Sequence, residues 1–156
     1  ALPFATRIAV VGAGGPDYAA LGYRLVRNPA PEAGQAGSLR LGVQAARDSG
    51  AAAVLIALAD MPFVKADHLH RLLAADGGAD ARVASSDGIR RSPPALFGRG
   101  WFDRLEQADG DQGARALLRD ATVVVADPHE LVDIDTPAAL RELSVDPAAA
   151  KPRRRS

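Results

Sequence analysis

The chain has 156 residues, 47% of them hydrophobic and 24% charged, which is typical of one globular domain with a buried core. Nineteen basic and nineteen acidic residues cancel, so no overall charge would attract a nucleic acid or an anionic membrane. The absence of cysteine excludes disulfides, thiolate metal ligands and a cysteine nucleophile. No apolar stretch approaches the roughly 20 residues of a membrane span, and no leader precedes the first apolar run, so we expect a cytoplasmic protein.

Apolar runs of strand character alternate with helical patterns along the chain. The predicted strands are 8–11, 24–26, 54–58, 82–85, 122–126 and 131–134. The predicted helices are one that begins at Ser38 and ends at Gly50, and those at 66–75, 101–108, 113–119 and 137–143. This alternation predicts an α/β fold with a mostly parallel sheet and helices on both faces.

We expect one domain over residues 1–145. The chain begins at Ala1 rather than Met and enters a predicted strand almost at once, so we expect a fragment or a processed chain. Residues 146–156 contain prolines, alanines and a basic cluster without apolar periodicity, which is typical of a disordered tail. A nucleic-acid role for its three consecutive arginines is the weaker alternative.

The tripeptide Asp60-Met61-Pro62 stands where the apolar run 52–59 ends. A carboxylate at the C-terminal edge of a buried strand lies where open α/β sheets bind ligands, and the proline ends the strand and opens a loop. Asp60 is therefore a candidate metal ligand. The alternative is a loop aspartate that caps the following helix.

Two glycine-rich segments follow predicted strands. The first, 11–17, fails the Gly-x-Gly-x-x-Gly spacing because Asp17 takes the place of the third small residue, so a plain turn is favoured. The second, 28–39, is a long loop that enters a helix at Ser38. Its backbone N–H groups and the helix N-terminus suit a polar or anionic ligand, whereas the alternative makes Ser38 simply an N-cap.

Segment 110–115 lies between two predicted helices. If Asp111 caps the second helix, the Arg115 guanidinium lies one turn inside it, where it could clamp a phosphate. The alternative is a turn followed by an exposed arginine.

Segment 131–137 carries two carboxylates, Asp133 and Asp135, which strand alternation would place on the same face. Asp60 plus one of this pair would suffice as protein ligands for Mg²⁺, which keeps several oxygens from water and phosphate. The alternative is that Asp135 caps the final helix.

The three histidines indicate no site. His68 and His70 are two residues apart on a predicted helix, so they face different ways and do not share a metal. We expect surface or supporting roles for both and for His129.

Five segments, taken in order, carry a resemblance to one known family. They are Asn28 with Gly34-x-x-Gly37-Ser38-Leu39, Leu58-Ala59-Asp60-Met61-Pro62, Pro93-Pro94-Ala95-Leu96-Phe97, Gly110-Asp111-Gln112-Gly113-Ala114-Arg115 and Asp133-Ile134-Asp135-Thr136-Pro137. Together they resemble nucleotidyltransferases of the molybdenum cofactor cytidylyltransferase type, within the molybdopterin nucleotidyltransferase-like fold. The resemblance extends over roughly residues 7–143.

The resemblance implies a Rossmann-like three-layer domain with bound Mg²⁺. Such a domain transfers a nucleoside monophosphate, CMP from CTP in this type, to a phosphorylated acceptor such as molybdopterin, with release of pyrophosphate. A molybdoenzyme is the protein partner that it implies. The residues that it places at the site form three groups: catalytic and metal-binding Asp60 and Asp135; nucleotide-binding Asn28, Gly37, Ser38 and Asp60; and acceptor-binding Asp111, Gly113 and Arg115.

Two departures from the family pattern matter. Family members open with a first strand and a Leu-Ala-Ala-Gly-x-Ser-x-Arg-x-Gly-x-x-Lys-like loop that holds the triphosphate, whereas residues 7–11 correspond to their second strand and no segment here matches the loop. We therefore expect these residues alone to be an incomplete form with weak or no activity, because phosphate charges would lack compensation. Ser92-Pro93-Pro94 also lacks the glycine that precedes the family's second proline, which leaves the acceptor open.

Two other functions remain open from the sequence. One is a non-catalytic, nucleotide-binding accessory module for molybdoenzyme maturation. The other is a nucleotide-sugar glycosyltransferase, but such enzymes usually carry Asp-x-Asp after the strand, and Asp60-Met61-Pro62 lacks the second acid.

Overall fold

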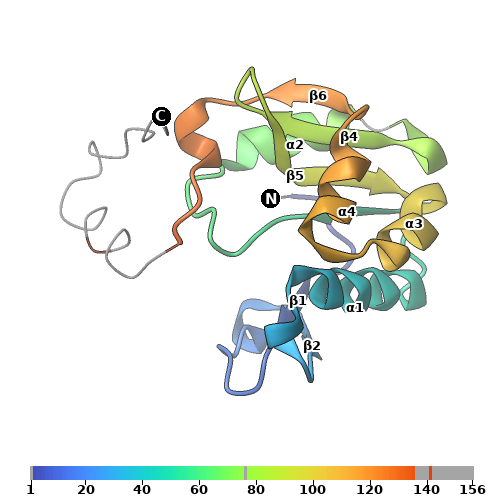
Figure 1. Ribbon diagram of the computed structural model, residues 1–156, viewed down its shortest axis with the longest axis vertical. Helices are drawn as coiled ribbons and strands as arrows, with labels where there is room; N and C mark the ends of the chain where they lie inside the picture. The colour runs from blue at the N-terminus through green and yellow to red at the C-terminus, as the bar shows by residue number, and fades with distance from the viewer. Residues whose placement is uncertain (1, 76, 136–140, 142–156) are drawn as a thin grey trace.

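The computed structural model describes residues 2–75, 77–135 and 141, and its frame is two β-sheets with packed helices (Figure 1). The strands are β1 (Ile8–Val11), β2 (Arg24–Arg27), β3 (Ala53–Ile56), β4 (Arg82–Ser86), β5 (Arg91–Gly98) and β6 (Thr122–Val125). The α-helices are α1 (Gln35–Asp48), α2 (Ala66–Ala74), α3 (Phe102–Gln107) and α4 (Gly110–Leu118). None of the helices in the described ranges is long and apolar enough to cross a membrane.

The larger sheet has four strands in the order β3-β5-β4-β6. β5 is antiparallel to both of its neighbours, whereas β4 and β6 are parallel, so β3, β4 and β6 run in one direction and β5 runs in the other. β1 and β2 form a separate parallel pair. Within the described residues, no strand pairing joins this pair to the larger sheet. The predicted α/β class is confirmed, and the sheet is mixed rather than purely parallel.

Helices cover both faces of the four-stranded sheet. On one face, α1, α3 and α4 pack against a core that includes Ala84 of β4 and Phe97 of β5. On the other face, α2 packs Leu72 against Val83 and Leu96, the residues just before those two. Because successive strand residues point to opposite faces, neighbouring apolar residues serve both layers. This is the expected three-layer arrangement.

Helix α1 connects the two sheets. Its Val43 belongs to the core on the larger sheet, and Leu39 packs at the edge of that core. On another side of the helix, Gly42 lies so close to β1 that a Cβ there would come within 3.3 Å of Val10 Cγ2. The extensive contacts that β1 and β2 make in the described part of the chain are with each other and with α1. The small pair is therefore held in place mainly by one helix.

Two helices begin earlier than the sequence predicts. Helix α1 begins at Gln35 with Gly34 as N-cap, so the prediction that Ser38 starts and caps this helix is wrong. Gly34 has φ +98°, a conformation that favours glycine, and this turn sets the start of the helix. Gly50, with φ +74°, ends it as expected. Helix α4 has Asp109 as N-cap, so Asp111 lies inside the helix and does not cap it.

One strand was not predicted, and one predicted strand is not formed. β5 was not predicted, because it contains Pro93 and Pro94, joined by a cis peptide bond, and prolines argue against a central strand. Conversely, 131–134 is not a strand: the 3₁₀ helix η5 (Pro128–Leu131) is followed by irregular chain up to Asp135. Of the predicted helix 137–143, only residue 141 is described, and it is helical; the tail 146–156 lies outside the described residues.

Candidate functional site

Asp60 lies in the turn that follows β3. The N-cap of the next helix, α2, is Lys65, so Asp60 does not cap that helix, and the alternative reading of this aspartate is wrong. Its Oδ1 atom is buried and has no hydrogen-bond partner among the described residues. An unpaired buried carboxylate oxygen is costly, so this atom suits a bound cation or an ordered water.

The segment that carries Asp133 and Asp135 runs beside Asp60. The backbone N–H of Ile134 donates to the backbone oxygen of Asp60 at 2.8 Å. In Figure 1 the orange-red segment after η5 and the green loop after β3 lie side by side at the left. Asp133 and Asp135, on either side of Ile134, are both exposed. The structure thus brings Asp135 to the loop of Asp60, although 131–134 is not the predicted strand.

The acidic groups at this site are few. Among the described residues, no group of three or more histidine or acidic side chains is placed to hold a metal ion. An all-protein cage, such as a structural zinc site, is therefore not present in this part of the chain. Two carboxylates fit Mg²⁺, which keeps several water ligands and takes others from substrate phosphates. Asp60 and Asp135 are compatible with such a site.

Three of the predicted nucleotide-binding residues lie together where β2 leads into α1. Asn28 is buried, and its Nδ2 donates to Ser38 Oγ at 3.0 Å while its Oδ1 accepts from the backbone N–H of Ala30. A Cβ at Gly37 would lie 3.7 Å from Asn28 Nδ2. Gly34, the N-cap, has no side chain, and no side chain of the described residues hydrogen-bonds to the first N–H groups of α1. Free N–H groups at a helix N-terminus are suited to an anion.

The predicted acceptor-binding residues Asp111, Gly113 and Arg115 all belong to α4. This helix packs on α1, β4 and β5. Arg115 lies within the helix, as the sequence predicts, and it is exposed, as in the alternative interpretation; the N-cap is Asp109 rather than Asp111.

An ion pair that the sequence did not indicate joins the start of α2 to η5. Lys65 Nζ donates to Glu130 Oε1 at 3.0 Å, and Glu130 is 8% exposed. The hydrogen bond to Glu130, together with its negative charge, raises the pKa of Lys65. No motif spacing relates residues so far apart in the sequence, so only the fold reveals this pair.

His68 is fully buried, so of the two expected roles, surface or supporting, the surface role is wrong for this histidine. Its Nε2 lies 2.7 Å from Ser85 Oγ, and Ser85 Oγ donates to the backbone oxygen of Pro94 at 2.6 Å. Its Nδ1 lies 3.2 Å from an Arg71 nitrogen. A histidine whose second nitrogen faces a guanidinium lacks the carboxylate of a catalytic triad, so this is a core network.

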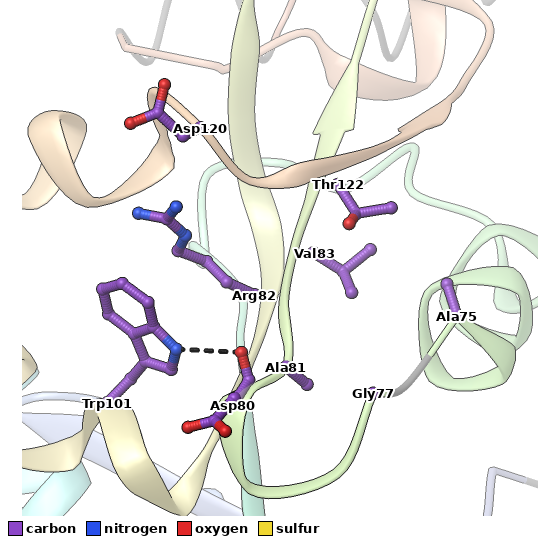
Figure 2. Close-up of a pocket in the computed structure, with 9 residues that line it drawn as sticks. All are labelled: Ala75, Gly77, Asp80, Ala81, Arg82, Val83, Trp101, Asp120 and Thr122. Carbon is purple, nitrogen blue, oxygen red and sulfur yellow. Dashed lines mark hydrogen bonds between the residues drawn. The ribbon is translucent and has the colours of Figure 1, made fainter.

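A hollow of about 260 Å³ lies elsewhere, where β4 and β6 begin (Figure 2). In it, Trp101 Nε1 donates to the backbone oxygen of Asp80 at 3.0 Å, and the Arg82 guanidinium lies 4.2 Å from the centre of the Trp101 ring. Asp60 follows the end of β3, which runs parallel to β4 and β6. The hollow therefore lies at the end of the sheet where β4 and β6 begin, opposite to the end that carries Asp60, and it is not part of the site around Asp60.

Comparison with known families identifies the domain. The profile of the MobA-like NTP transferase domain matches residues 1–130, most of the chain. The chain belongs to this family. A curated relative, the purine catabolism protein PucB of Bacillus subtilis (strain 168), is 37% identical over 112 residues, which cover 68% of this chain and 54% of PucB. This MobA-like chain thus spans about half the length of the relative.

Solved structures show the same fold. Rv0371c of Mycobacterium tuberculosis H37Rv, in complex with manganese, has 24% identity and a TM-score of 0.66, over 90% of this chain and 78% of that chain. Molybdopterin-guanine dinucleotide biosynthesis protein A from Archaeoglobus fulgidus has 22% identity and a TM-score of 0.51, over 77% of this chain and 66% of that chain. Identities this low support the MobA-like fold alone.

Proposed function

We propose that this MobA-like domain serves an Mg²⁺-dependent nucleotidyltransferase. The reaction moves a nucleoside monophosphate from a nucleoside triphosphate to a phosphorylated acceptor and releases pyrophosphate. The observation that carries the proposal is the buried Asp60 Oδ1, which has no hydrogen-bond partner within the described ranges and lies on a loop bonded to the chain segment of Asp135. We favour CTP and a molybdopterin-type acceptor on the sequence resemblance, and a molybdoenzyme as the partner that receives the product.

Each group of residues has a defined task in this reaction. Asp60 and Asp135 hold Mg²⁺, which when bound neutralises phosphate charge. Asn28, Gly37 and Ser38 orient the nucleotide at the uncapped start of α1, where the helix dipole favours negative charge. The acceptor phosphate attacks the α-phosphorus while the bond to pyrophosphate breaks, so catalysis consists mainly of positioning and charge compensation.

Fewer residues can be assigned to the acceptor and to the triphosphate than to the metal and the nucleotide. Asp111, Gly113 and Arg115 of α4 are proposed to face the acceptor, with the Arg115 guanidinium as the phosphate-binding group. No segment of the chain matches the family's triphosphate-binding loop. We therefore propose full activity for a polypeptide that supplies such a loop, and weak or no activity for residues 1–156 alone.

The first prediction tests the carboxylate. In a polypeptide that contains both the loop and these residues, Asp60→Asn should lower pyrophosphate release by about 100-fold or more, because it removes a charge at the reacting phosphates. Pyrophosphate release is measured with CTP and with GTP, each with molybdopterin as acceptor. Asp48→Asn, an exposed aspartate at the end of α1, is the matched control. Full turnover by Asp60→Asn would exclude the proposed site.

A non-catalytic, nucleotide-binding accessory module for molybdoenzyme maturation is the alternative function. That alternative predicts nucleotide binding that Asp60→Asn weakens, with no pyrophosphate release from any triphosphate. Equilibrium nucleotide binding, measured beside turnover on the same protein, separates the two functions.

A further inference from the structure

We propose that Lys65 and Glu130 are a positioning pair, which holds the segment of Asp135 against the loop of Asp60 and so sets the spacing of the two carboxylates. The inference rests on the proposed function, because the spacing matters only if the carboxylates share a cation. Neither residue belongs to the segments that carry the family resemblance.

The two segments are fastened to each other at two points. Ile134 N–H donates to the Asp60 backbone oxygen at 2.8 Å, and Lys65 Nζ donates to Glu130 Oε1 at 3.0 Å. Asp60 comes before Lys65 in its segment, whereas Ile134 comes after Glu130, so the segments run in opposite directions between the two contacts. Met61, which lies within this stretch, is buried. The backbone hydrogen bond therefore joins the two segments beside Asp60 and Asp135, and the ion pair joins the same two segments farther from these carboxylates.

The backbone hydrogen bond alone is a weak constraint. A single backbone hydrogen bond adds little net stability, and Ile134 lies in irregular chain, where no strand pairing among the described residues supports it. A hydrogen bond in which the donor and the acceptor are charged is stronger than one between neutral groups. The Glu130 side chain is 10% exposed, and its Oε2 is buried without a hydrogen-bond partner among the described residues. Lys65 thus supplies the charge that compensates a carboxylate held out of solvent.

The Lys65 side chain is 68% exposed, so its loss should alter local geometry more than global stability, and variants should fold. This makes Lys65 the better residue to change. Lys65→Met removes the charge and keeps the aliphatic stem, and Lys65→Arg keeps the charge. Arg47→Met is the matched control, because Arg47 forms ion pairs with Asp103 and Glu106 between α1 and α3, away from Asp60.

The second prediction concerns metal affinity and backbone protection in the full chain. Lys65→Met should weaken the binding of Mn²⁺, measured by electron paramagnetic resonance titration, by about tenfold, the size typical of residues that orient metal ligands. It should also speed hydrogen exchange at the Ile134 amide. Lys65→Arg should retain most of the affinity and protection, and Arg47→Met should leave both unchanged.

The outcomes separate this inference from the proposed function. If Lys65→Met binds Mn²⁺ like the unmodified protein while Asp60→Asn loses binding, the positioning role is wrong and the metal site stands. Equal losses in Lys65→Met and Arg47→Met would also overturn the positioning role, since they would reflect general destabilisation. If Mn²⁺ does not bind, or Asp60→Asn does not weaken it, the proposed function itself fails.

Discussion

The protonation state of His68 follows from its neighbours. Ser85 uses its hydroxyl proton to bond Pro94, so Ser85 Oγ must accept the proton on His68 Nε2. Nδ1 is then the unprotonated nitrogen that accepts from Arg71. Burial, and next the positive charge of Arg71, lowers the pKa of His68, and the negative charge of Glu130 opposes this more weakly. The neutral imidazole is therefore the form that the folded core accommodates.

A third prediction follows from that pKa. Because the pKa of His68 is lower in the folded than in the unfolded protein, the unfolded protein binds more protons as the pH falls below about 6.5. The stabilisation from neutral His68 is complete above that pH and is lost below it, with a slope of at most about 1.4 kcal/mol per pH unit for one group.

The measurement is the free energy of unfolding in urea between pH 7 and pH 5. His68→Gln keeps an N–H donor for Ser85 and should flatten this pH dependence, although it lowers stability at pH 7. His70→Gln, an exposed histidine on the same helix, should leave the slope unchanged. Identical slopes for all three proteins would contradict the assigned role of His68.

At the scale of single elements, the end of β5 is unusually crowded. Gly98 donates its N–H to the Ala81 backbone oxygen at 2.8 Å, and a Cβ there would overlap the backbone carbonyl groups of Gly78 and Ala79. β5 is the strand that pairs with both β3 and β4. A shift of the end of β5 therefore disturbs its pairing with both β3 and β4.

The fourth prediction is that Gly98→Ala lowers the free energy of unfolding by about 1–3 kcal/mol, the usual cost of overpacking a core position. Chemical denaturation measures the effect. Gly77→Ala is the control, because a Cβ there would meet Ala81 Cα at 3.8 Å, an ordinary contact. Equal stability of the two variants would show that the 3₁₀ turn over Gly78–Asp80 moves freely away from β5.

Local patterns predict the elements whose stability is local. Strands β1, β4 and β6 were predicted within a residue or two at each end, because each coincides with a short run of strand character in the sequence itself. β5 was missed because it contains two prolines, which argue against a central strand when the sequence is considered alone. Its place between β3 and β4 is decided by tertiary packing. The strand prediction for 131–134 was wrong because a local pattern was not sufficient there. Its alternating residues resemble a strand, but the backbone N–H of Ile134 bonds to the turn of Asp60 instead of to a neighbouring strand.

The candidate site follows the same division. The position of Asp60 after a strand and the neighbourhood of Asn28 and Ser38 could be predicted from sequence, since each depends on one strand end or one loop. The pairing of Lys65 with Glu130 could not, because it depends on how the chain returns after β6.

At the scale of the whole molecule, α1 carries the connection between the β1–β2 pair and the larger sheet. The fifth prediction is that Gly42→Leu, which places a side chain where Val10 now approaches, speeds amide exchange in β1 and β2. Amides of β4 should be little affected, and Gln44→Leu, on an exposed position of α1, is the control. Hydrogen-exchange mass spectrometry measures the exchange rates. Equally faster exchange in β1, β2 and β4 would contradict the prediction that only the strand pair is loosened.

The Asn28–Ser38 hydrogen bond joins the end of β2 to the first turns of α1, so it spans the junction between the small strand pair and the rest of the protein. A nucleotide that contacts Asn28 can bind only to molecules in which that junction is closed. Its apparent affinity is then reduced by the fraction of molecules in which the strand pair has detached. If Asn28 contacts the nucleotide as proposed, ligand binding and the local folding of residues 8–28 are thermodynamically linked, and a change that loosens the β1–β2 pair would raise the apparent dissociation constant without altering a nucleotide contact.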